Sequence, residues 1–185
     1  MKKTSITLLA FAALALNTFG QARLWEHGKD PLNDFGYAIG NPATKEVYYV
    51  KSYFDEAAGF YMDKIMYTQL GPNESWLSPE PLPAPINDDF NNSVVGISED
   101  GETLYLLGNY NAANPRARVG LSYTTRTDSG WTKPEPIKLK GLLPRTEFYS
   151  FYVTPNSEYV FATFNKSKKK DDDLFIAKKQ GDGSY

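Results

Sequence analysis

Short runs of alternating apolar and polar residues fill most of this chain, and the runs return at a nearly fixed spacing. Residues 46–50 (EVYYV) return as 102–106 (ETLYL), and they return again, after the same interval, as 158–162 (EYVFA). The heptapeptide 76–82 (WLSPEPL) returns after almost the same interval as 131–137 (WTKPEPI). A fixed period of this kind indicates repeated supersecondary units that are stacked or arranged around an axis.

Each repeat predicts the same elements: an apolar first strand, a turn, a strong second strand, a polar loop and a third strand. The strong strand is rich in β-branched and aromatic residues, and the turn before it in residues that favour a tight reversal. The strong strands are predicted over 47–53, 103–108 and 159–164. The polar loops are predicted over 54–62, 109–118 and 165–172, and the third strands over 64–70, 119–126 and 174–179.

The Trp-x-x-Pro-Glu-Pro segments that close the repeats are expected to be edge strands or arms outside the sheet, because proline cannot donate to an interior ladder. No 3.6-residue apolar period is sustained after the N-terminal segment, so almost no helix is expected. Four short antiparallel strands per repeat are typical of a propeller blade. A β-sandwich is the alternative, but it gives no reason for matching heptapeptides one period apart. Trp76 and Trp131 are expected to pack between neighbouring blades.

The predicted fold is therefore all-β, a partial β-propeller of about two and a half four-stranded antiparallel blades. The predicted units are 34–87, 88–145 and 146–185, the last one incomplete. Because propellers typically close with four to eight blades, three explanations stay open. The chain is part of a longer protein, which we favour, or it assembles with other copies of itself, or it is a degenerate gene product.

The N-terminus has the pattern of a secretory signal peptide. Lys2 and Lys3 precede an uncharged apolar run over 6–16, and small and polar residues follow to Ala22. This run is too short to span a bilayer comfortably, and no later segment is apolar enough to do so. We expect a signal peptide over 1–22, a leader segment over 23–33, and an exported, periplasmic or extracellular product.

Composition narrows the chemistry. The chain has no cysteine, which excludes a disulfide framework and a thiol nucleophile, and its single histidine, His27, excludes a His-rich zinc site. A Ser-His-Asp triad would have to use His27 in the leader segment, so none is expected. Without Lys2 and Lys3 the formal charge falls from −2 to −4, which argues against nucleic acid as a partner. No cofactor or metal is expected.

Two stretches carry a family resemblance. Residues 86–108 (INDDFNNSVVGISEDGETLYLLG) and 122–139 (SYTTRTDSGWTKPEPIKL) resemble the WD40-like β-propeller repeats of the TolB type. In those repeats a Ser-Pro-Asp-Gly turn precedes a strand and a Gly-Trp-Ser-x-Pro segment closes the unit. The counterparts here are 98–101 (SEDG) and 130–134 (GWTKP). The resemblance covers roughly residues 34–185.

The resemblance implies a bacterial envelope protein but no particular activity. An aspartate of the family's later strand matches Asp63 and Asp173, whereas the middle unit has Arg118 or Val119 there. We expect an exported, non-catalytic binding or scaffolding module whose partner is a protein or a glycan, with self-association as a further possibility. The alternative is the propeller part of a secreted carbohydrate- or peptide-active hydrolase whose catalytic region is missing from this chain.

One candidate site follows from the repeat. Asp34, Asp89 and Glu147 recur once per unit, each directly before a phenylalanine. If first strands line a central channel, these carboxylates form a ring that favours a cation or a cationic peptide end. Alternatively, each carboxylate accepts backbone N–H groups of its own turn. The charged run 166–173 (KSKKKDDD) is expected to be a solvated hairpin tip rather than a calcium site.

Overall fold

The computed structural model describes residues 35–57, 59–113, 118–142, 144, 149–165 and 172–185. The predicted signal peptide and leader segment, Asp34, Glu147 and the loop residues 166–171 lie outside the described residues. Within the described part the chain forms strands and no α-helix, as the sequence predicted. No helix of membrane-spanning length and apolarity occurs there.

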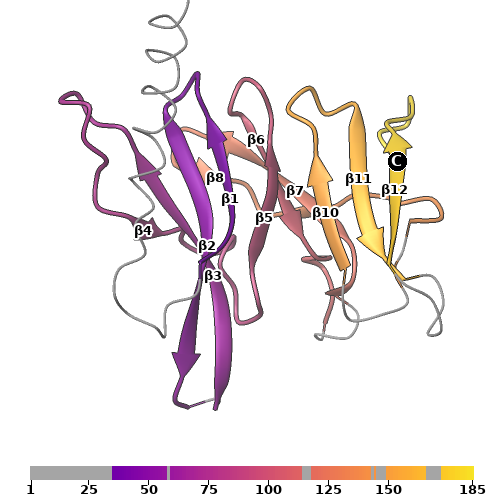
Figure 1. Ribbon diagram of the computed structural model, residues 1–185, viewed down its shortest axis with the longest axis horizontal. Coiled ribbons are helices and arrows are strands. Elements are labelled where there is room, and N and C mark those ends of the chain that lie inside the picture. Colours follow the sequence, from indigo (N-terminus) through magenta and orange to yellow (C-terminus); the bar gives the residue numbers. More distant parts are fainter. Residues whose placement is uncertain (1–34, 58, 114–117, 143, 145–148, 166–171) are drawn as a thin grey trace, which may run out of the picture. The chain divides into compact units, whose positions relative to one another are not determined.

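The strands form three antiparallel sheets (Figure 1). The first sheet contains β1 (Phe35–Asn41), β2 (Glu46–Asp55), β3 (Phe60–Gln69) and β4 (Glu80–Pro81). The second contains β5 (Ser93–Ile97), β6 (Thr103–Leu107), β7 (Leu121–Thr127), β8 (Gly130–Trp131) and β9 (Glu135–Pro136). The third contains β10 (Tyr149–Val153), β11 (Tyr159–Phe164) and β12 (Asp173–Lys178). The all-β prediction is confirmed. The sheets have four, five and three strands, where two four-stranded units and an incomplete third were predicted.

The two Pro-Glu-Pro segments lie where their prolines predicted. The two-residue strand β4 pairs only with β3, and β9 pairs only with β7, so both are edge strands. An edge position tolerates proline because one side of such a strand has no ladder partner that needs an N–H donor.

The loop predicted over residues 54–62 was wrong. β2 continues to Asp55 and β3 begins at Phe60, so the connection is residues 56–59 alone. Gly59 closes this turn, with a φ of 75° and a backbone N–H that donates to the Asp55 carbonyl at 2.7 Å. Aromatic and β-branched residues continue the strand period on both sides of the turn, and this favours pairing over an open loop.

The strand pairing in the first two repeats is offset by one residue from the alignment of their sequences. Tyr48 pairs with Ile39 on β1 and with Tyr67 on β3, and Tyr105 pairs with Gly96 on β5 and with Tyr123 on β7. Both tyrosines face the sheet that follows their own, so Tyr105 is the structural equivalent of Tyr48. The alignment of 46–50 with 102–106 had instead predicted Leu104. Successive residues of a strand face opposite sides, so this difference decides which side chains enter which core.

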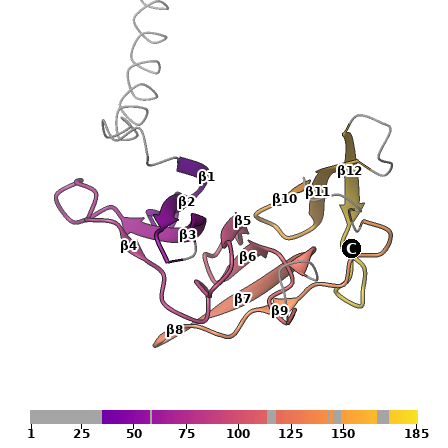
Figure 2. The ribbon, with the colours of Figure 1, turned by 90° about the horizontal axis from the view of Figure 1, so that it is seen from below.

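The three sheets follow one another in chain order (Figure 2). An apolar core fills each of the two junctions between them. The first core packs Tyr48 and Ile65 of the first sheet against Leu104 and Leu106 of the second, and all four are essentially inaccessible to solvent. The rings of Tyr48 and Trp131 also meet edge to face, with centroids 6.2 Å apart and an interplanar angle of 80°. The prediction that Trp131 packs between units is thus confirmed.

The second core repeats this arrangement one sheet further along. Tyr105 and Leu121 of the second sheet pack against Val153, Val160 and Phe164 of the third. A Cβ built on Gly96 would lie 2.8 Å from the Val153 carbonyl oxygen, so the glycine lets β5 and β10 approach closely.

The same face of the third sheet is open. Leu174 is the register equivalent of Ile65 and Leu121, yet its side chain is 64% exposed. Ile176, beside it on the same face, is 60% exposed. Within the described residues, each of the two earlier sheets has this face covered by the next sheet, and the third has not.

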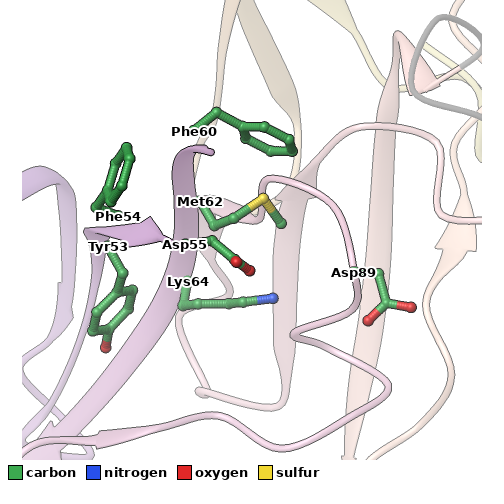
Figure 3. Close-up of a pocket in the computed structure, with 7 residues that line it drawn as sticks. All are labelled: Tyr53, Phe54, Asp55, Phe60, Met62, Lys64 and Asp89. Atoms are coloured by element: carbon green, nitrogen blue, oxygen red, sulfur yellow. The ribbon is translucent and has the colours of Figure 1, made fainter. Parts of the chain in front are cut away.

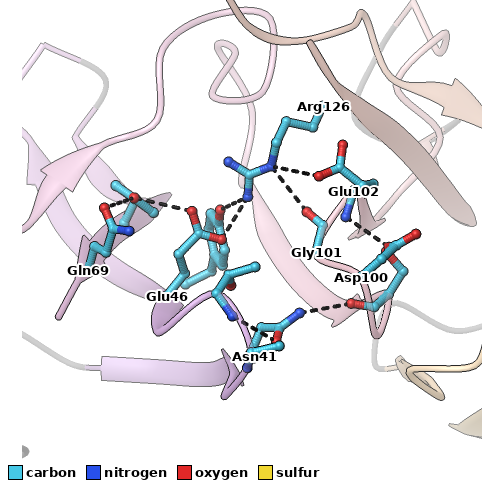
Figure 4. Close-up of polar contacts among 12 residues, drawn as sticks. Asn41, Glu46, Gln69, Asp100, Gly101, Glu102 and Arg126 are labelled. Atoms are coloured by element: carbon cyan, nitrogen blue, oxygen red, sulfur yellow. Dashed lines mark hydrogen bonds and ion pairs between the residues drawn. The ribbon is translucent and has the colours of Figure 1, made fainter. Parts of the chain in front are cut away.

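Polar contacts reinforce the junction between the first and second sheets (Figure 4). Arg126 Nη2 donates to Glu46 Oε2 at 2.7 Å and to the Tyr48 hydroxyl oxygen at 3.1 Å, and its Nε donates to the Gly101 carbonyl at 3.2 Å. Burial raises the pKa of Tyr48, so its hydroxyl stays neutral and can accept this bond.

The turns before the strong strands also touch. Asn41 Nδ2 donates to the carbonyls of Ser98 and Glu99, both at 3.1 Å. The backbone N–H of Glu99 in turn donates to the Pro155 carbonyl at 2.9 Å. The three turns are therefore linked in chain order.

Candidate functional site

Among the pairs that the structure describes, the first sheet has the longest hairpin, and its end has no described counterpart in the other two sheets. β2 and β3 pair along their whole length, well beyond the point where the pairing of β6 with β7 and of β11 with β12 ends. The shared part of the hairpin reaches Val50↔Ile65, the equivalent of Leu107↔Leu121. The remaining pairs run from Lys51↔Lys64 to Asp55↔Phe60 and form the hairpin extension. Function has to be argued from a site and not from the repeat itself, so this departure from the repeat is the place to look for one.

The end of the hairpin extension displays aromatic rings. Phe54, Phe60 and Tyr61 are 55%, 54% and 48% exposed. Phe54 and Tyr61 are cross-strand partners whose rings meet edge to face, with centroids 5.3 Å apart and an interplanar angle of 67°. We call these three residues the aromatic tip. Successive pairs of a hairpin alternate in direction, so Phe54 and Tyr61 lie on one face and Phe60 lies on the other.

A hollow of about 470 Å³ lies beside the aromatic tip (Figure 3). Figure 3 shows Asp55 and Lys64 extending from the hairpin toward Asp89, with Phe60 and Met62 above them. Asp89 comes from the loop that precedes β5, so two separate segments line the hollow. The residues that line it are Tyr53, Phe54, Asp55, Phe60, Met62, Lys64 and Asp89.

The loop that carries Asp89 is anchored on both sides. Lys64 Nζ donates to the Asp88 carbonyl, and the Asp88 carboxylate accepts Arg118 Nη1 at 2.7 Å. The backbone N–H of Asn92 donates to the Asp63 carbonyl at 2.9 Å, which fastens the loop to the hairpin. Asp89 itself is exposed, so a fixed loop presents its carboxylate to solvent.

Arg118 is the centre of this anchor. Its side chain is buried between two rings, with the guanidinium carbon 4.2 Å from the Tyr110 centroid and 4.9 Å from the Phe90 centroid. Its Nη2 also donates to Asn92 Oδ1, which accepts the Tyr110 hydroxyl as well. Burial raises the pKa of Tyr110, which keeps the phenol protonated as a donor. This network positions the loop; it does not face the hollow.

The hollow combines an apolar wall with a small excess of negative charge. Asp55 and Asp89 supply two carboxylates, and the one cation among the lining residues, Lys64, is directed to the Asp88 carbonyl. Tyr53 uses its hydroxyl toward the Met66 sulfur at 3.0 Å, and burial raises its pKa. The hollow can therefore accept hydrogen bonds from a cationic group while the rings pack against an apolar stem.

The structure places only part of the predicted carboxylate ring. Asp89 lines the hollow, whereas Asp34 and Glu147 lie outside the described residues, so the ring stays a prediction. The alternative to the ring was that Asp89 accepts backbone N–H groups of its own turn. The structure gives such a contact to the neighbouring Asp88, whose Oδ1 accepts the Phe90 N–H at 3.0 Å. Asp172 and Asp173 of the charged run are exposed. Where residues are described, no group of three or more His, Cys, Asp and Glu side chains could hold a metal ion.

The aromatic tip was missed because residues 54–62 were assigned to a loop. Two signals could have revealed it. The runs on either side of the turn are both rich in aromatic and β-branched residues, and a short connection that ends in Gly59 is typical of a hairpin.

No protein-family model and no curated protein matches this chain. The resemblance to TolB-type repeats therefore stays a prediction, and function has to be argued from the geometry of the hairpin extension and the hollow.

Proposed function

We propose that this chain is an exported, non-catalytic binding module of the bacterial envelope, built as an arc of propeller blades of the TolB type. Three successive antiparallel sheets, produced by the sequence repeat and packed in chain order, support this architecture. The signal-peptide pattern supports export.

The binding surface in this proposal is the aromatic tip together with the hollow that contains Asp55 and Asp89. The single observation that carries it is the combination of three half-exposed rings on the hairpin extension with two carboxylates, Asp55 of the hairpin and Asp89 of the loop before β5. Aromatic residues are enriched at the centre of protein–protein interfaces, where they bury a large area at low entropic cost.

The partner that fits this surface best is a protein segment that carries a lysine or arginine next to an apolar residue. A cationic head would reach Asp55 and Asp89, and its neighbour would pack on Phe60 and Met62. A glycan is favoured less, because Phe54 and Tyr61 meet edge to face and do not form one flat platform.

Titration of the isotope-labelled chain with a short basic peptide, acetyl-Lys-Leu-Arg-Leu-amide, tests the proposal. Amide shifts should concentrate in residues 53–64 and at Asp89, and they should weaken as salt rises. Phe60→Ala and Asp89→Asn should each weaken binding by about fivefold to tenfold. Leu77→Ala is the matched control, since Leu77 is 53% exposed but does not line the hollow.

Two results would contradict the proposal. One is stronger binding of a chito-oligosaccharide than of the basic peptide at the same residues, which would assign the surface to glycans. The other is turnover of a glycan or peptide substrate by the purified chain, which would favour the hydrolase alternative.

A further inference from the structure

The outer edge of β3 is occupied along most of its length. β4 pairs with Met66 and Tyr67, and the Leu82 N–H donates to the Ile65 carbonyl at 2.9 Å. Further along, a side chain of the loop before β5 takes the place of a strand. Asn87 Oδ1 accepts the Ile65 N–H at 2.8 Å, and its Nδ2 donates to the Ile65 carbonyl at 2.9 Å. A side-chain amide thus supplies the donor and the acceptor that a paired strand would supply.

The same kind of pairing continues at Asp63 and ends there. The Asp63 N–H donates to Asn91 Oδ1 at 3.1 Å, and the Asp63 carbonyl accepts the Asn92 N–H at 2.9 Å. Backbone groups alternate in direction along a strand, and β3 has no bulge here, so the next residue with both groups on this edge is Tyr61. Within the described part of the chain, nothing pairs with this edge beyond Asp63, and Tyr61 is 48% exposed. An open edge of this kind is a template for another strand.

The side chains around Tyr61 are divided between two faces of the hairpin. Phe54 and Tyr61 lie on one face, whereas Phe60, Met62 and Asp55 lie on the other, beside the hollow. A flat partner surface would cover only one of these faces. An extended segment that runs along the edge turns successive side chains to opposite faces, so it reaches both.

The carboxylates are divided as well. Asp55 and Asp89 line the hollow (Figure 3). On the opposite face the Asp63 carboxylate accepts the Ser52 hydroxyl at 2.5 Å, and the exposed side chains there are the two rings. A segment in which cationic and apolar residues alternate therefore matches both faces, because its cations meet the carboxylates of the hollow and its apolar residues meet the rings.

We propose that the partner segment adds as an antiparallel strand to the outer edge of β3 at Tyr61. This inference rests on the proposed function, since it takes the hairpin extension as the binding surface. One apolar residue of the segment lies opposite Tyr61, exchanges both backbone hydrogen bonds with it and packs toward Phe54. The residues before and after it lie opposite Met62 and Phe60. Their methylene stems pack there, and their charges reach the carboxylates of the hollow.

The experiment uses the full chain and the peptide acetyl-Lys-Leu-Arg-Leu-amide, in which cationic and apolar residues alternate. In the proposed arrangement the leucine N–H groups point to β3, and the lysine and arginine N–H groups point to solvent. A peptide N-methylated at both leucines should bind about tenfold more weakly than the parent peptide. A peptide N-methylated at lysine and arginine should bind within about twofold of the parent. Both variants carry two methyl groups, so a general effect of methylation is the same in each.

Hydrogen exchange gives a second readout on the chain itself. Saturating parent peptide should slow the exchange of the Tyr61 amide by about tenfold, because the bound strand accepts its N–H. The Met62 amide faces β2 and is already paired, so its exchange should change little.

The outcomes separate this inference from the proposed function. Equal binding of the two methylated peptides, with amide shifts that remain in residues 53–64 and at Asp89, would overturn strand addition but not the binding surface. Weaker binding of the peptide methylated at lysine and arginine than of the other variant would overturn the assignment of residue types to the two faces. An absence of shifts in residues 53–64 at millimolar peptide would overturn both proposals.

Discussion

Arg126 and Glu46 are 80 residues apart in the sequence, and their side chains form an ion pair of 2.7 Å between the first and second sheets. The Glu46 side chain is only 6% exposed, and the guanidinium also lies over the Trp131 ring at 4.6 Å. A buried carboxylate needs a partner, so this contact fixes how the two sheets meet.

Arg126→Leu should lower the free energy of unfolding by about 2 to 4 kcal/mol, because it leaves the Glu46 carboxylate buried without its cation. Glu102 is the matched control: it lies 3.9 Å from the same guanidinium but is 55% exposed. Glu102→Gln should change the stability by less than about 0.5 kcal/mol. Denaturant unfolding of both variants measures the difference, and equal effects would contradict the assignment.

Gly96→Ala should destabilise the fold even though alanine is usually preferred to glycine inside a strand. The new Cβ would meet the Val153 carbonyl oxygen at 2.8 Å, and the expected cost is about 1 to 3 kcal/mol. Gly40→Ala on β1 is the control, because its nearest atoms lie 3.8 Å away. It should be neutral or stabilising by about 0.5 kcal/mol. Thermal melts decide, and a stabilised Gly96→Ala would show that the sheets are less closely packed.

Asp182 should titrate at unusually low pH. The Ser184 hydroxyl, the Lys140 ammonium and the Ser184 backbone N–H hold the pKa of Asp182 well below its ordinary value of 3.8. Since the folded state favours the carboxylate, this stabilisation is present above the pKa of the unfolded chain. It is lost as the pH falls through the lower folded pKa. Ser184→Ala should raise the pKa of Asp182 in a ¹³C carboxyl titration, whereas Ser78→Ala should leave it unchanged.

Arg118→Met should loosen the loop that presents Asp89. The substitution removes the 2.7 Å ion pair with Asp88 and the packing of the guanidinium on Tyr110 and Phe90. The expected loss is about 2 to 4 kcal/mol of stability, with faster hydrogen exchange at Asn91 and Asn92. The comparison variant is Lys133→Met, an exposed basic residue of the second unit. Unchanged exchange in the Arg118 variant would mean that the hairpin alone holds the loop.

The open face of the third sheet should drive self-association. Leu174 and Ile176 are exposed at positions whose equivalents are covered in the first two sheets, and apolar faces of this kind associate in water. The wild-type chain should sediment with a concentration-dependent mass, and the double variant Leu174→Lys, Ile176→Lys should be monomeric. Phe54→Lys, a change at an exposed apolar residue elsewhere, should not have this effect. A strictly monomeric wild type with a sharp melt would count against the prediction.

Much of the fold could be predicted from the sequence, because the repeat consists of residues with strong preferences for strands or turns. Turn residues and proline placed the reversals and the edge strands β4 and β9 correctly. The aromatic tip was not placed in the same way, since the repeat suggested a loop where the first unit extends its hairpin. Aligning the three repeats therefore hid the longer hairpin of the first unit.

The register offset and the contacts of Asp89 depend on tertiary structure. The sequence aligns Glu46 with Glu102, yet Glu46 begins a strand and is buried, whereas Glu102 belongs to a turn and is exposed. Turns of similar length place their left-handed residue differently, at Lys45 in the first unit and at Gly101 in the second. Neither the anchor formed by Arg118 nor the hollow has a sequence signal, because their segments meet only through packing. The contacts of Asp88 with Lys64 and Arg118, for example, join residues 24 and 30 positions apart.

The register offset sets a rule for anyone who wishes to recombine these repeats. A chimaera that exchanges β2 for β6 according to the sequence alignment would put Tyr48 in the place of Leu104, with its ring on the wrong side of the sheet. An exchange that matches Tyr48 with Tyr105 would keep each aromatic residue facing the next sheet. Natural recombination between the repeats meets the same constraint. The first and second units therefore cannot replace each other even where their residues are identical.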